Sequence, residues 1–192
     1  MEPIIDWEAR YQAATTAWER EHINPGFNEW RELFAQSPGS VIIPGCGRAP
    51  EVVAFAELGW AVTGVDLADT AVGYQRDALR RTGLVGHVEQ FNVLAWAPQD
   101  PVDLVYEQTC LCALDPAQWT DYARQLHAWL KPGGVLAALF MQTGKDGGPP
   151  FHCELAAMRD LFGADEWEWD VQTFHSEHPM GIHELGCLLT RL

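Results

Sequence analysis

The segment VIIPGCGR, at positions 41–48, joins an apolar run to a glycine-rich turn. The β-branched residues of the run favour a buried strand, which Pro44 and Gly45 end. Residues 51–58 then have helical spacing, and Gly59 is a natural C-terminal cap. The segment therefore predicts a strand, a tight turn and a helix. The glycines of such a turn let the backbone approach a ligand closely, beside the free N–H groups of the helix N-terminus.

The same alternation continues along the chain. Strands are predicted at 61–65, 87–91, 103–106 and 135–140, helices at 69–81, 116–130 and 153–161, and two late strands at 166–174 and 182–191. Strands that alternate with helices of this length imply right-handed crossovers and a parallel sheet covered on both faces. The last two strands are joined by too few residues for a helix, which predicts an antiparallel hairpin. We expect an α/β, doubly wound, Rossmann-like and mostly parallel sheet of seven strands with an antiparallel C-terminal hairpin strand.

Length and composition limit the class of protein. The 192 residues fit one domain, and 47% hydrophobic residues indicate a folded core. A net charge of −15, without a Lys/Arg cluster, argues against nucleic acid as a partner. No apolar run reaches the length of a membrane span, and the N-terminal residues show no secretory signal. The five cysteines are odd in number, so we expect reduced thiols and a cytoplasmic protein.

The end of the second predicted strand indicates what the turn binds. That strand ends at Asp66, nineteen residues after Gly47. A carboxylate at this place can accept hydrogen bonds from two ribose hydroxyls, at the edge of the sheet where open α/β folds bind ligands. The pattern predicts an adenosine-bearing ligand. NAD, FAD and S-adenosylmethionine all meet that description.

Pro50 helps to choose among these ligands. A dinucleotide site usually has a third glycine there, so that the helix can pack close under a pyrophosphate. Proline is compatible with the first helical turn, but it removes an N–H that could hold a phosphate. S-adenosylmethionine carries no phosphate, and its cationic sulfonium suits the net charge better. One 192-residue sheet also leaves little room for a separate dehydrogenase substrate domain.

Several segments resemble class I S-adenosylmethionine-dependent methyltransferases, and more narrowly the thiopurine S-methyltransferase family with its thiol, halide and chalcogen methyltransferase relatives. The superfamily features are the glycine turn and VTGVDL at 62–67. The narrower likeness is carried by DWEARY at 6–11 running to TAW at 16–18, DLVYEQTCLCAL at 103–114, LKPGG at 130–134 and GPPF at 148–151. The similarity spans nearly the whole chain.

The resemblance implies a role for individual residues. Residues 1–38 would form an N-terminal helical lid over a core of residues 39–192, and Trp18 would lie over the cofactor. The implied cofactor contacts are Gly45, Cys46, Gly47 and Arg48 at the methionine portion, Asp66 and Leu67 at the ribose, and Asn92 and Val93 at the adenine. The family often has an Asp-Phe-Phe-like segment where this chain has Asn92.

Glu107 and Gln108 would lie near the sulfonium and the acceptor, with Glu107 also in contact with the cofactor. A strand-end carboxylate such as Glu107 can also be a purely structural group. Drug-metabolising members of the family carry an arginine at the position of Gln108. Gln108 cannot supply that charge, which argues against thiopurine itself as the substrate.

The resulting hypothesis is methyl transfer from S-adenosylmethionine to a small soft nucleophile: a thiol, or a sulfide, selenium or tellurium species. A thiolate needs little general-base help, and the sequence shows no Ser-His-Asp or paired-carboxylate arrangement. The chain would act as a monomer or weak homodimer on a small-molecule acceptor, without a membrane. The acceptor itself and the pathway are not encoded in the pattern.

Three alternatives stay open. The same scaffold can methylate oxygen or nitrogen of another small metabolite, with His152 or His175 as the base. It can also serve a dinucleotide-dependent oxidoreductase, or a non-catalytic module that binds S-adenosylmethionine. His175, His178 and His183 match no familiar metal spacing, so we expect no metal site.

Overall fold

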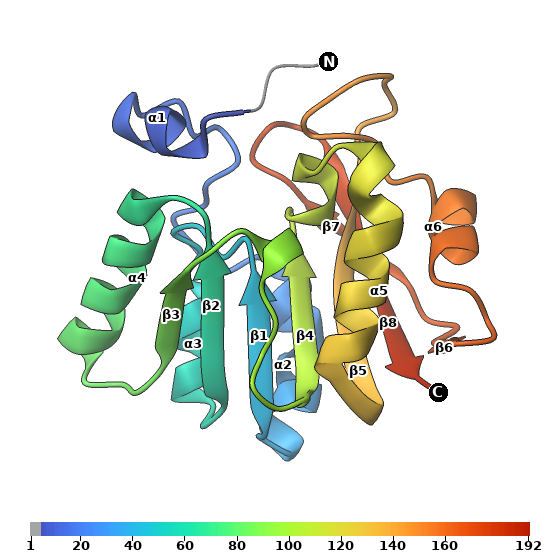
Figure 1. Cartoon of the computed structure of the whole chain (residues 1–192), viewed down its shortest axis with the longest axis horizontal. Helices are drawn as coiled ribbons and strands as arrows, with labels where there is room; N and C mark the ends of the chain where they lie inside the picture. Colours follow the sequence, from blue (N-terminus) through green and yellow to red (C-terminus); the bar gives the residue numbers. More distant parts are fainter. Residues whose placement is uncertain (1–4) are drawn as a thin grey trace.

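The computed structural model describes residues 5–192, which form a single mixed sheet with helices on both faces (Figure 1). The order of strands across the sheet is β3-β2-β1-β4-β5-β8-β6, with β7 paired to β8. The helices are α1 (Trp7–Gln12), α2 (Pro25–Gln36), α3 (Glu51–Glu57), α4 (Asp69–Thr82), α5 (Trp119–Trp129) and α6 (Leu155–Leu161). The strands are β1 (Ser40–Pro44), β2 (Ala61–Asp66), β3 (His87–Gln90), β4 (Val102–Gln108), β5 (Leu130–Gln142), β6 (Trp167–Trp169), β7 (Phe174–Glu177) and β8 (His183–Arg191).

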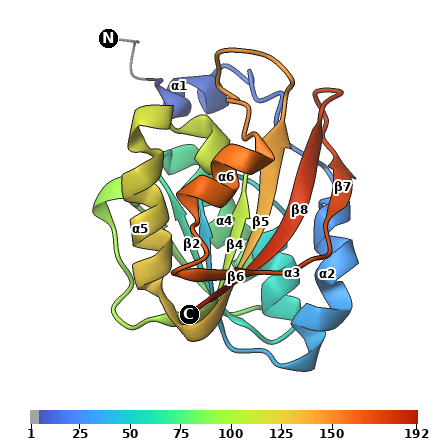
Figure 2. The same cartoon turned by 90° about the vertical axis from the view of Figure 1, so that its right-hand side faces the viewer.

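The first five strands are parallel, and the chain order reverses between β1 and β4. Side chains along a strand alternate between the two faces of the sheet, and β1 shows this clearly. Val41 and Ile43 pack with α2, α3 and α4, whereas Ile42 packs with α5 and α6. Figure 2, a side view, shows α5 and α6 on one face of the sheet and α2 and α3 on the other. The predicted doubly wound fold is confirmed.

The C-terminal strands differ in number from the prediction. β8 pairs antiparallel with β7, which confirms the predicted hairpin, and it also runs antiparallel to β5 over eight paired residues. The single strand expected at 166–174 is divided into β6 and β7, so the sheet has eight strands and not seven. Asp170 causes the break, because its carboxylate accepts a hydrogen bond from Gln172 N at 2.9 Å. That contact forms a local turn that competes with the ladder.

Residues 5–38 do not form one structural unit. α1 lies over the edge of the sheet where the parallel strands end (Figure 1), while α2 packs into the core. Phe27 and Phe34 of α2 are buried against Phe55 of α3, with the ring centroids of Phe27 and Phe55 4.9 Å apart. The segment that covers the sheet edge is therefore α1 and the loop after it. We call residues 6–20 the lid segment.

Candidate functional site

The turn after β1 is locked to the end of β2 by backbone groups. Gly47 N donates to Asp66 Oδ2 at 2.8 Å, and Ala68 N donates to Asp66 Oδ1 at the same distance. Gly45 and Gly47 both have positive φ angles, of 56° and 50°, which residues with a side chain rarely adopt. A Cβ on Gly47 would also stand 2.7 Å from the hydroxyl oxygen of Tyr11. The turn therefore needs glycine both for its backbone and for the space that it leaves.

Asp66 is buried, and burial raises its pKa while the N–H donors around it oppose the rise. A carboxylate held by two backbone donors keeps further lone pairs for a ligand. Its position at the carboxyl end of β2 is at the edge where open α/β sheets bind ligands.

The lid segment is fastened to three different elements. Glu8 accepts hydrogen bonds from the backbone N and hydroxyl of Thr70 in α4, at 3.0 and 2.6 Å. Glu19 receives two hydrogen bonds from the Arg48 guanidinium, and this contact raises the pKa of Arg48. Arg20 donates to Glu184 of β8 at 3.1 Å. Each anchor joins the lid to a different side of the sheet edge.

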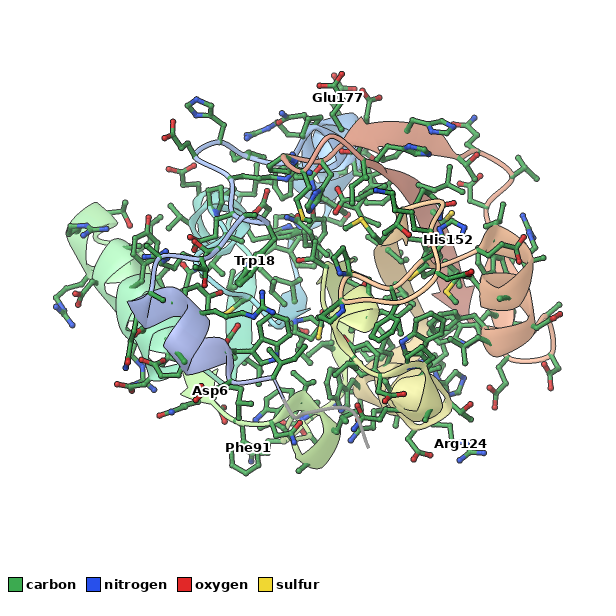
Figure 3. The ribbon with its side chains drawn as sticks, turned by 90° about the horizontal axis from the view of Figure 1, so that it is seen from above. Asp6, Trp18, Phe91, Arg124, His152 and Glu177 are labelled. Carbon is green, nitrogen blue, oxygen red and sulfur yellow. The ribbon has the colours of Figure 1, made fainter. Side chains whose placement is uncertain are left out.

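Under the lid lies a cavity of about 230 Å³ at the carboxyl ends of the parallel strands. Figure 3 looks down on this edge, with Trp18 near the middle of the view and Phe91 at its rim. The residues singled out by the sequence that line this cavity are Trp18, Gly45, Cys46, Gly47, Arg48, Asp66, Leu67, Asn92, Val93 and Gln108. Trp18 meets Trp7 and Tyr11 edge to face, with centroids 5.5 and 5.9 Å apart.

Glu107 is not among the residues that line the cavity. It is 2% exposed, and its carboxylate accepts a hydrogen bond from Leu111 N at 2.6 Å. Burial raises the pKa of Glu107 to about 7. Neighbouring residues of a strand face opposite ways, so Tyr106 and Gln108 reach the cavity where Glu107 does not. The hydroxyl of Tyr106 donates to Gln108 Oε1 at 2.8 Å and so orients that amide.

The structure adds residues that sequence reasoning did not identify. Arg20, Glu51 and His178 line the cavity with Tyr106. The one sequence pattern close to Arg20 is Asn24-Pro25, which is typical of a helix start. In the structure the Asn24 side chain caps α2 by accepting a hydrogen bond from Gly26 N. Arg20 and Glu184 are 164 residues apart in the chain, so no spacing rule could have paired them.

Neither His152 nor His175 lines the cavity, although both were named as bases for an alternative reaction. Figure 3 shows His152 away from Trp18 in that view. His178 does line the cavity, and burial lowers its pKa to about 4. Within residues 5–192, no group of three His, Cys, Asp or Glu side chains could hold a metal ion.

The cysteines of the cavity are protonated thiols at neutral pH. Cys46, Cys110 and Cys112 line it and are each buried. Burial raises the pKa of all three thiols well above the ordinary value. A protonated, enclosed thiol is a poor nucleophile, so these residues shape the cavity and do not react.

Solved structures of other proteins share this fold. One is a Burkholderia thailandensis 1,6-didemethyltoxoflavin-N1-methyltransferase with bound S-adenosylhomocysteine, with a TM-score of 0.77 and 20% identity, covering 97% of this chain and 85% of that one. Another is magnesium protoporphyrin IX methyltransferase from Synechocystis PCC 6803 with bound S-adenosylhomocysteine, with a TM-score of 0.74 and 14% identity, covering 96% and 94%. These likenesses show the fold that carries the glycine turn, Asp66 and the cavity; together with the family match over residues 4–182, the class is that of S-adenosylmethionine-dependent methyltransferases.

The family follows from the sequence comparisons. The model of the thiopurine S-methyltransferase family matches residues 4–182, and the chain belongs to that family. A Pseudomonas putida protein named thiopurine S-methyltransferase is 28% identical over 210 residues, covering 98% of this chain and 96% of its own. An Arabidopsis thaliana protein named probable thiol methyltransferase 2 is 29% identical over 156 residues, covering 78% of this chain and 68% of its own.

Among residues 5–192, no helix is long and apolar enough to cross a membrane.

Proposed function

We propose that this enzyme transfers the methyl group of S-adenosylmethionine to a small, soft sulfur nucleophile, or to a selenium or tellurium analogue of one. The observation that carries the proposal is one cavity that brings the glycine turn, Asp66 and the lid residue Trp18 against an acceptor end formed by Tyr106 and Gln108. Relatives are named thiol, thiocyanate and thiopurine methyltransferases, which supports a soft acceptor.

The proposed cofactor contacts follow the order of the cavity wall. Gly45, Cys46 and Gly47 offer backbone groups to the methionine portion, and Asp66 with Leu67 holds the ribose. Asn92 and Val93 follow β3, where an adenine would lie. Arg48 is bound to Glu19, so its proposed part is to hold the lid beside the methionine portion.

The bound sulfonium supplies an activated methyl group, so the protein has mainly to align the two reactants and exclude water. Orientation of this kind contributes roughly 7–11 kcal/mol toward the barrier of a bimolecular reaction. Trp18 and Tyr11 close the cavity from the lid side. Gln108, oriented by Tyr106, faces the acceptor, while Glu107 supports the turn after β4 and holds no reactant. No covalent enzyme intermediate is required.

The remaining proposals concern the setting of the reaction. We propose a cytoplasmic enzyme that acts as a monomer or weak homodimer on a small-molecule acceptor, with no nucleic-acid partner. The chain would work as one methyltransferase domain of residues 1–192, in which the lid is narrowed from residues 1–38 to the lid segment and α2 belongs to the core.

Calorimetric titration with S-adenosylmethionine, S-adenosylhomocysteine and NADH tests the cofactor. Micromolar binding of both adenosyl ligands and none of NADH is expected; binding of NADH alone would refute the proposal. A methylation screen over thiols, sulfide, selenite and tellurite then tests the acceptor. Cofactor binding without turnover on any acceptor would favour a non-catalytic module.

The Trp18→Ala variant tests the lid. Loss of the indole should weaken binding of S-adenosylmethionine in calorimetry and leave the melting temperature almost unchanged, because Trp18 is only half-buried in the chain alone. A large fall in melting temperature with unchanged binding would instead make Trp18 a packing residue.

A further inference from the structure

Thr109 has a backbone conformation that its residue type rarely adopts. It follows the last residue of β4 and has a φ angle of 62°, in the left-handed region. A branched Cβ makes this region strongly unfavourable, whereas glycine adopts it without strain. Among the described residues other than glycine, Ala14 is the one further residue with a positive φ angle. Thr109 lines the cavity and Ala14 does not.

The end of a helix explains the conformation of Ala14 but not that of Thr109. Ala14 and Thr15 follow α1, and their N–H groups donate to carbonyls of its last turn at 3.2 and 3.0 Å. This pair of hydrogen bonds is a common way to close a helix, with a left-handed residue at the position of Ala14. Thr109 follows a strand, so helix closure is not its cause. Backbone strain of this kind persists where the surroundings impose it, and it gathers at functional sites.

Buried hydrogen bonds hold the turn that contains Thr109. The carboxylate of Glu107 accepts from Leu111 N at 2.6 Å, and Glu107 is itself buried. The indole N–H of Trp119 donates to the carbonyl of Leu111 at 2.9 Å. These contacts fix the chain just before and just after Thr109, and so they impose its conformation.

The side chain of Thr109 has only lone pairs to offer to a ligand. Its hydroxyl donates its one proton to the carbonyl of Gln108 at 2.6 Å. A hydroxyl whose proton is used in this way can still accept from a further partner. An oxygen lone pair attracts a cation and the polarised C–H bonds beside the cationic centre. Glycine at position 109 would relieve the strain but would remove this oxygen.

Thr109 also lies between the two parts of the cavity. Gln108, before it in the chain, belongs to the proposed acceptor end. Cys110, after it, packs on the glycine turn, because a Cβ on Gly45 would stand 3.0 Å from Cys110 Sγ. The order of strands reverses between β1 and β4 at this point, and open α/β sheets bind ligands in the crevice formed there. In the proposed function, a methyl group that moves from cofactor to acceptor crosses this place.

We propose that the hydroxyl oxygen of Thr109 contacts the sulfonium methyl group of S-adenosylmethionine and holds it in line with the acceptor. The inference rests on the proposed function and adds a residue to its site. In the transfer, a lone pair of the acceptor forms the new bond to the methyl carbon, and the electron pair of the old bond stays on the cofactor sulfur. Thr109 gains and loses no proton. The contact is absent with S-adenosylhomocysteine, which has neither the methyl group nor the positive charge on sulfur.

Calorimetry with both forms of the cofactor tests the contact, because a packing role would affect the two ligands alike. Thr109→Val keeps the shape of the side chain and removes the hydroxyl. We expect it to bind S-adenosylmethionine about 5-fold more weakly, or worse, and S-adenosylhomocysteine within about 2-fold of the wild type. Thr109→Ser keeps the hydroxyl and should bind both ligands as the wild type does. Thr82→Val is the matched control and should change neither dissociation constant, since this exposed hydroxyl also donates to a backbone carbonyl, that of Ala78 at 3.0 Å.

Thr109→Gly separates the strain from the side chain. Its melting temperature should stay within about 2 °C of the wild type or rise, because glycine fits the backbone conformation, while it loses affinity for S-adenosylmethionine alone.

Equal weakening of both ligands in Thr109→Val, or an unchanged ratio of the two dissociation constants, overturns the inference and leaves the proposed function standing. Absence of methyl transfer by a wild type that binds both ligands overturns the proposed function, and with it the alignment by Thr109. If Thr109→Val does not fold, Thr109→Gly and Thr109→Ser decide by the same ratio.

Discussion

The two walls of the cavity are built over very different distances along the chain. On the cofactor wall, Gly47 and Asp66 are 19 residues apart and belong to consecutive strand-turn-helix units. On the opposite side, which we call the acceptor wall, Arg20 lines the cavity, and Arg20 and Asn24 reach Glu184, behind the lining, across 164 and 160 residues. The first wall uses backbone groups that any parallel sheet presents, whereas the second uses buried side chains. We therefore expect binding of the cofactor to depend on a local pattern, and selection of the acceptor to depend on long-range packing.

Asn24→Ala should have the largest effect, because it removes the residue that joins the acceptor wall. The variant loses hydrogen bonds to Glu184, from Gly26 N and from the Ser176 hydroxyl. The helix loses its cap and buried groups are left without a hydrogen bond, which together lowers the free energy of unfolding by about 2–4 kcal/mol. At this chain length that is roughly 5–15 °C in melting temperature.

Asn28→Ala, at an exposed position of the same helix, is the control for this loss. It should change the melting temperature by no more than about 1–2 °C. If both variants melt alike, the acceptor wall is not held by Asn24.

Asp66→Ala tests the cofactor wall. Charge-assisted hydrogen bonds contribute about 1.5–3 kcal/mol each, so binding of S-adenosylmethionine should weaken roughly 10- to 100-fold or more in calorimetry. The control is Asp69→Ala, an exposed carboxylate in the first turn of α4. An unchanged dissociation constant in a folded Asp66→Ala protein would remove Asp66 from the cofactor site.

The pH dependence of stability tests whether Glu107 lies outside the cofactor site. Burial raises the pKa of Glu107 to about 7, so the folded protein binds a proton that the unfolded chain releases near pH 4.5. Its contribution to the free energy of unfolding is therefore present below about pH 4.5 and is lost as pH rises through about 7. Glu107→Gln should flatten the fall in melting temperature between those pH values and leave cofactor binding unchanged. Weakened cofactor binding would place Glu107 in the site after all.

Glu19→Gln should have the smallest effect. The Glu19–Arg48 pair is partly exposed, with 22% and 30% of the side chains accessible, and pairs of this kind contribute about 0.2–1 kcal/mol. We expect S-adenosylmethionine to bind roughly 1.5- to 5-fold more weakly, with the difference reduced in high salt. Asp77→Asn, which breaks the exposed pair with Arg80, should leave binding as it is. A 100-fold loss would mean that the lid controls the cofactor wall.

The same contrast explains what the sequence could predict. The periodic segments gave the strands β1 to β5 and the helices α3 to α6, because each depends on local propensity and burial. The division of β6 from β7 escaped notice, since it depends on the side chain of Asp170 forming a turn. Ten of the predicted site residues line the cavity. Most of them belong to motifs at strand ends, which local sequence can identify.

What the sequence missed shares one physical property. Arg20, Glu51 and Glu184 carry no motif, and each is explained only by partners from distant elements. Glu107 was assigned to the cavity on resemblance, but strand alternation turns it to the opposite face of β4. Placing such groups requires the register of the sheet, which a pattern does not supply.

The distance between Arg20 and Glu184 also bears on biosynthesis. At about 5–20 residues per second, a ribosome needs roughly 8–33 s to add the 164 residues that separate them. During that time the glycine turn and β2 can form, while Arg20 and the side-chain amide of Asn24 lack their partner Glu184. The acceptor wall is therefore the last part of the cavity to be completed. A nascent chain stalled before β8 would hold a nearly finished cofactor wall with nothing to select its acceptor.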